Sequence, residues 1–86
     1  MSAPPFTPEY FQSEMAGFRK LMGRHSFWRG DKPRNAMRGL LHVYANTPEL
    51  PISDIFQLRN LIDEFAMRLE MACMTGIYQA EEGSAS

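Results

Sequence analysis

The sequence predicts an all-α fold, a small three-helix domain with a long C-terminal helix. Three segments carry apolar residues at the three- and four-residue spacing of an amphipathic helix, and almost none alternates as a half-buried strand does. Proline and glycine separate the three segments, as expected between helices. Because 86 residues have room for one core, we expect one domain over 7–78, a flexible arm at 1–6 and a flexible tail at 79–86.

The composition excludes several classes of protein. The chain is 44% hydrophobic and 22% charged, which is ordinary for a globular protein. No apolar run approaches the roughly 20 residues that span a bilayer, and the first residues lack the basic and apolar blocks of a signal peptide. A single cysteine, Cys73, cannot form an intramolecular disulfide, and we interpret it as a small buried residue. We therefore expect a cytoplasmic protein with no membrane contact.

The first predicted helix runs from Pro8 to Met22. Thr7 can cap it, Pro8 suits the first helical position, and Glu9 favours the positive end of the helix dipole. Gly23 is a natural stop. Its predicted apolar face consists of Tyr10, Phe11, Met15, Phe18, Leu21 and Met22.

The second predicted helix runs from Pro33 to Ala45. It follows a turn in which Asp31 is a possible cap, and Pro48 lies just beyond its end. Its predicted apolar face consists of Met37, Leu40, Leu41 and Tyr44. Basic residues recur on the opposite face, so this helix is clearly amphipathic.

The third predicted helix is the longest, from Ser53 to Tyr78. Asp54 and Gln57 have the spacing of a capping box, in which a side chain three residues into the helix reaches back to the cap. Its main apolar face consists of Ile55, Leu58, Ile62, Phe65, Leu69 and Ala72. At about 1.5 Å per residue this helix is long for so small a domain.

A second apolar stripe follows the same helix. Met67, Met71, Met74 and Tyr78 are spaced by four, three and four residues, and Phe56 lies near the same line. Either the other two helices straddle the third, or its C-terminal half docks onto another chain. Methionine suits adaptable protein contacts because its side chain is flexible and polarisable. We therefore predict a protein interface here, with the third helices of a homodimer side by side.

The basic residues are concentrated in one segment. Seven of the nine fall between positions 19 and 38, whereas acids outnumber arginines from Glu49 onward. Such a segment can bind nucleic acid or an acidic partner, with Trp28 as a stacking platform for bases. The alternative is that Phe27 and Trp28 fill the core while the arginines pair with acids of the third helix. The candidate binding residues are Arg24, Trp28, Arg29, Lys32, Arg34 and Arg38.

No catalytic pattern stands out. The sequence contains no glycine-rich phosphate loop, no nucleophile elbow and no zinc motif. Glu14 is a lone carboxylate within an apolar helix face. No second acid, histidine or nucleophile has a spacing that would let it form a catalytic site with Glu14. We expect no enzyme, no cofactor, no metal and no small-molecule substrate.

The sequence therefore predicts a small non-enzymatic regulatory or adaptor protein. Its expected partners are a second copy of itself and an unidentified protein. The alternative is a nucleic-acid-binding regulator that uses the basic 19–38 segment.

Overall fold

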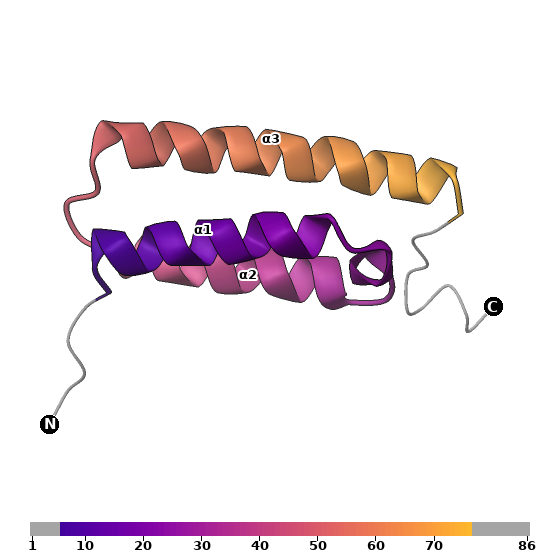
Figure 1. The fold of residues 1–86 in the computed structure, drawn as a ribbon, viewed down its shortest axis with the longest axis horizontal. Coiled ribbons are helices and arrows are strands. Elements are labelled where there is room, and N and C mark those ends of the chain that lie inside the picture. The colour runs from indigo at the N-terminus through magenta and orange to yellow at the C-terminus, as the bar shows by residue number, and fades with distance from the viewer. Residues whose placement is uncertain (1–5, 77–86) are drawn as a thin grey trace, which may run out of the picture.

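The computed structural model describes residues 6–76, which form three α-helices and one short 3-10 helix. The helices are α1 (Pro8–Met22), η1 (His25–Trp28), α2 (Lys32–Ala45) and α3 (Ile52–Met74). Figure 1 shows α1 and α3 running in the same direction. Helix α2, which lies between them in the sequence, runs in the opposite direction. The all-α prediction is confirmed, and no strand occurs within residues 6–76.

Helix α1 has the bounds that the sequence predicts. The Thr7 hydroxyl oxygen accepts a hydrogen bond from the Tyr10 amide at 3.1 Å, which satisfies one of the free donors in the first turn. Pro8 occupies the first turn and Gly23 follows the last helical residue. These signals are local in the chain, so they could be read from the sequence without knowledge of the packing.

Helix α2 begins one residue earlier than predicted, at Lys32. The Asp31 side chain makes no capping hydrogen bond, so that part of the prediction is wrong. Instead the Asp31 carboxylate lies 3.9 Å from the Arg34 guanidinium, and its carbonyl accepts from the Asn35 amide at 2.9 Å. The connection from α1 is long because it contains η1, whose aromatic residues enter the core.

Helix α3 differs from the prediction at both ends. It begins at Ile52, after Pro51, and has no side-chain cap. Asp54 turns inward and accepts a hydrogen bond from Gln12 of α1 at 2.9 Å, so the predicted capping box with Gln57 is wrong. The helix ends at Met74, because Gly76 adopts a left-handed conformation with φ of 80°. Tyr78, the predicted end, lies outside the described residues.

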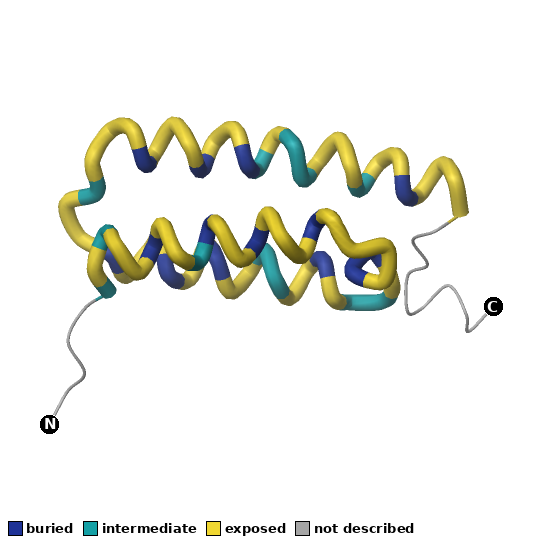
Figure 2. The backbone as a smooth tube through the Cα atoms, in the orientation of Figure 1, coloured by how far each residue is buried: buried dark blue, intermediate teal, exposed yellow. Residues whose placement is uncertain are grey.

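The central helix of the bundle is α1, which packs against both α2 and α3. Its buried residues, spaced along one stripe, are Phe11, Met15, Phe18 and Met22. Figure 2 shows that the buried residues of α3 face the other helices, whereas the opposite edge is exposed along its length. The alternative in which the other two helices straddle the third is therefore wrong. The arrangement is thin, measuring 45 × 30 × 16 Å.

The 3-10 helix closes one end of the core with two aromatic rings. Phe27 and Trp28 are both buried. The Phe27 ring meets Phe18 edge-on at 6.0 Å between centroids, and the Trp28 ring lies 5.7 Å from Phe65 of α3. These contacts join α1, η1 and α3. The two aromatic residues therefore belong to the core, which is the alternative to a role in binding bases.

Candidate protein-interaction surface

The face of α3 that points away from α1 carries a row of exposed apolar side chains. Phe56, Met67, Met71 and Met74 are 60%, 61%, 57% and 79% exposed, and Ile52 at the start of the helix is 71% exposed. We call these five residues the α3 outer face. On an ideal helix at about 100° per residue they fall within one arc of roughly 100°, on the side opposite Leu58 and Leu61. Solvent-exposed apolar rows of this kind mark interaction surfaces more often than scattered single residues do.

The structure places four of the five predicted interface residues on this face. The fifth, Tyr78, lies outside the described residues. Ile52 was missed, although its position on the helical wheel could have found it. Cys73 is exposed rather than buried. The prediction that this cysteine is a buried residue is therefore wrong.

A shallow groove adjoins the outer face near the C-terminal end of α3. Its volume is about 520 Å³. The residues that line it are Trp28, Glu64, Met67, Arg68, Met71, Ala72 and Thr75. Met67 and Met71 belong to both the groove and the outer face, so the apolar surface is continuous across the two.

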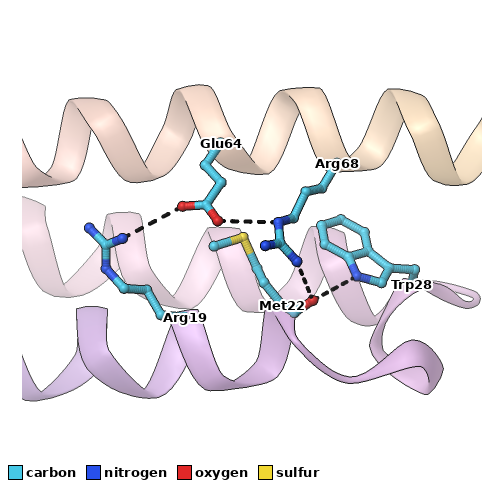
Figure 3. Close-up of polar contacts among 5 residues, drawn as sticks. All are labelled: Arg19, Met22, Trp28, Glu64 and Arg68. Atoms are coloured by element: carbon cyan, nitrogen blue, oxygen red, sulfur yellow. Dashed lines mark hydrogen bonds and ion pairs between the residues drawn. The ribbon is translucent and has the colours of Figure 1, made fainter.

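A polar network holds the wall of this groove in place. The Glu64 carboxylate of α3 forms ion pairs with Arg19 of α1 at 3.5 Å and with Arg68 at 3.2 Å, as Figure 3 shows. Arg68 also donates to the Met22 carbonyl at 3.2 Å, and the Trp28 indole N–H donates to the same oxygen at 3.0 Å. Both donors satisfy a carbonyl in the last turn of α1, where cationic groups are favoured by the helix dipole.

The second predicted site is an exposed basic surface on α2 and the connection before it. We call its residues, Arg24, Arg29, Lys32, Arg34 and Arg38, the basic surface. All five are exposed, and only Arg34 forms an ion pair with a described acid, at 3.9 Å from Asp31. The acids of α3 neutralise little of the basic segment, because Glu64 pairs with Arg19 alone from residues 19–38.

The basic surface spreads over two sides of α2. Arg24 and Lys32 line one shallow pocket beside Phe27, whereas Arg34 and Arg38 line another between α2 and α3. Trp28 does not belong to this surface. The residue is 7% exposed and its indole N–H donates to the Met22 carbonyl, so the predicted role as a stacking platform for bases is not available in this conformation.

The remaining candidates for chemistry are isolated. Glu14 is half-buried beside a pocket between α1 and α2, and no other acid, histidine or nucleophile lines that pocket. Within residues 6–76 no group of three or more potential ligands could hold a metal ion. In the same part of the chain, no helix combines the length and apolar character needed to cross a membrane.

Comparisons of the chain with known families, with curated proteins and with solved structures give no match.

Proposed function

We propose that this chain is a small regulatory or adaptor protein that acts by binding another protein, and that it forms a homodimer through the α3 outer face. One observation carries the proposal. The apolar residues Phe56, Met67, Met71 and Met74 are all more than half exposed and lie along one side of one helix. Fully burying a side chain of this size stabilises an assembly by about 1.5–3 kcal/mol.

The composition of the surface favours a protein partner. Three of its five residues are methionine, whose flexible side chain can fit an apolar surface of varied shape. The groove beside it supplies a recess for a large apolar side chain, and methionine and phenylalanine are typical of the buried centre of protein interfaces.

The experiment is a measurement of mass in solution over a range of concentrations, by sedimentation velocity. Wild-type protein is expected to shift from one chain to two as its concentration rises. The double variant Met71→Asp and Met74→Asp is expected to remain a single chain, because an interface cannot bury two new carboxylates without partners. Its helical content and melting temperature are expected to match the wild type at low concentration, since both side chains are exposed in the monomer.

Leu41→Asp is the matched control. Leu41 is also an exposed apolar residue, at 40%, but it lies on α2 and outside the proposed interface. This variant is expected to associate as the wild type does. A double α3 variant that kept both the wild-type mass and the wild-type affinity for partners would overturn the proposal.

A second candidate function is nucleic-acid binding by the basic surface. The observation that favours it is that Arg24, Arg29, Lys32 and Arg38 form no ion pair with the described acids. Unpaired basic side chains on one region of a small protein attract phosphates and release their counterions on binding.

A further inference from the structure

The apolar residues of the α3 outer face alternate with charged ones. Arg59, Asp63 and Glu70 are exposed, and none of them forms an ion pair with a described residue. Charged residues at the border of a helix–helix interface decide which partner binds and in which orientation. Their arrangement therefore favours one orientation of two paired copies of α3 over the other.

Arg59 and Glu70 lie on the same edge of the apolar row. They are separated by 11 residues, close to three full turns, so on an ideal helix their directions differ by only about 20°. Asn60 and Met71 lie on the opposite edge, and Asp63 lies near the middle of the face. One edge therefore carries a positive charge near the start of the helix and a negative charge near its end.

The two possible orientations use these edges differently. In an antiparallel pair of helices, each edge of one helix meets the same edge of the other, whereas in a parallel pair it meets the opposite edge. A parallel, symmetric pair also sets identical residues at one level, which would bring the two Asp63 carboxylates together. An antiparallel pair instead sets Arg59 against Glu70 of the second copy, twice by symmetry.

We infer that the α3 outer face pairs with the same face of a second copy in the antiparallel orientation, with Arg59 opposite Glu70. This inference rests on the proposed function and adds to it the orientation and the register of the two helices. The same register brings Phe56 within one residue, about 1.5 Å along the axis, of the level of Met74 of the second copy. A contact between an aromatic ring and a thioether is favourable. It also moves the two Asp63 side chains apart by about 4.5 Å along the helix axis.

The size of the surface predicts a reversible dimer. The row from Phe56 to Met74 extends about 27 Å at 1.5 Å per residue. One pair of helices over that length buries less than the roughly 1,600 Å² of a standard protein–protein interface. Association is therefore expected to depend strongly on concentration, and each test below is made across a concentration series.

The first test reverses the two charges. Arg59→Glu and Glu70→Arg are each expected to weaken dimerisation by about tenfold, because each replaces two attractions by two repulsions. The variant that carries both changes restores the opposite charges across the interface and is expected to return close to the wild-type dissociation constant. Asp31→Arg, a change at a partly exposed acid outside the α3 outer face, is the matched control and is expected to leave the dimer unchanged.

The second test traps the orientation covalently. Cys73 is first replaced by serine, since it is exposed on α3 and would form disulfides of its own. Chains carrying F56C and chains carrying M74C are then mixed and oxidised. The antiparallel register predicts a disulfide between the two different chains, and little product when either variant is oxidised alone.

The outcomes separate the inference from the proposed function. A dimer in which M74C chains cross-link to one another, or in which the double charge reversal does not restore affinity, overturns the antiparallel orientation and leaves the protein-binding surface standing. If the wild-type protein remains a single chain at every concentration, the inference that the α3 outer face binds a second copy is wrong. Loss of partner binding in the Met71→Asp and Met74→Asp variant would then still support a surface for a different protein.

Discussion

Asp54 brings a carboxylate into the core of the bundle. It is 1% exposed, its Oδ1 accepts from the Gln12 amide, and its Oδ2 has no hydrogen-bond partner within the described structure. A buried acceptor that loses a partner costs far more than the net value of an ordinary hydrogen bond, because its lost hydration is not replaced. The contact between α1 and the start of α3 therefore depends on one polar side chain.

Gln12→Ala is expected to lower the free energy of unfolding by about 1–3 kcal/mol, since it leaves both carboxylate oxygens of Asp54 without a side-chain donor. The measurement is urea denaturation followed by circular dichroism. Gln57→Ala is the matched control, because Gln57 is exposed and makes no side-chain hydrogen bond in the described structure. Equal losses in the two variants would show that the Gln12–Asp54 bond contributes nothing specific.

Truncating a side chain is expected to lower the stability of the monomer much more on the inner face of α3 than on its outer face. Leu61 is fully buried against α1, so Leu61→Ala is expected to cost about 2–5 kcal/mol of stability. Met67 is 61% exposed, and Met67→Ala is expected to change monomer stability by less than about 0.5 kcal/mol. Both are measured by denaturation at a protein concentration below that of dimer formation. A large loss for Met67→Ala would mean that the outer face is already buried within the single chain.

The elements differ in how far the sequence could predict them. Helix α1 was predicted at both ends because Thr7, Pro8 and Gly23 act within a few residues of the helix. The inward turn of Asp54 could not be predicted, since its partner Gln12 is 42 residues away in the chain. The second stripe on α3 is recognisable from its spacing, but only the packing of the helices, with the stripe left exposed, determines which of its two interpretations holds.

At the scale of the molecule, charge is divided between two regions. Basic side chains gather on the end of α1, on α2 and in the connection between them, whereas α3 and the chain after it carry most of the acids. The described ion pairs between the regions are limited to Arg19 with Glu64. The basic surface therefore retains its positive charge in the folded chain, which is the condition that nucleic-acid binding requires.

This retained charge leads to a prediction that can be measured with labelled duplex DNA. If the basic surface binds phosphates, the logarithm of the affinity falls linearly with the logarithm of the salt concentration, by about 0.9 for each phosphate contacted. Lys32→Ala with Arg38→Ala is expected to reduce that slope by about 2 and to weaken binding equally for all sequences, because neither side chain forms an ion pair with a described acid. Fluorescence anisotropy across a salt series measures both quantities.

Arg19→Ala is the control for this experiment, because Arg19 lies in the same basic segment but its charge is already offset by Glu64 at 3.5 Å. Its slope is expected to stay near that of the wild type. Binding that is absent at low salt, or a double variant with an unchanged slope, would exclude the basic surface as a nucleic-acid site. A positive result would be compatible with the α3 dimer, since the two surfaces share no residue, and a dimer would then present two basic surfaces to one nucleic acid.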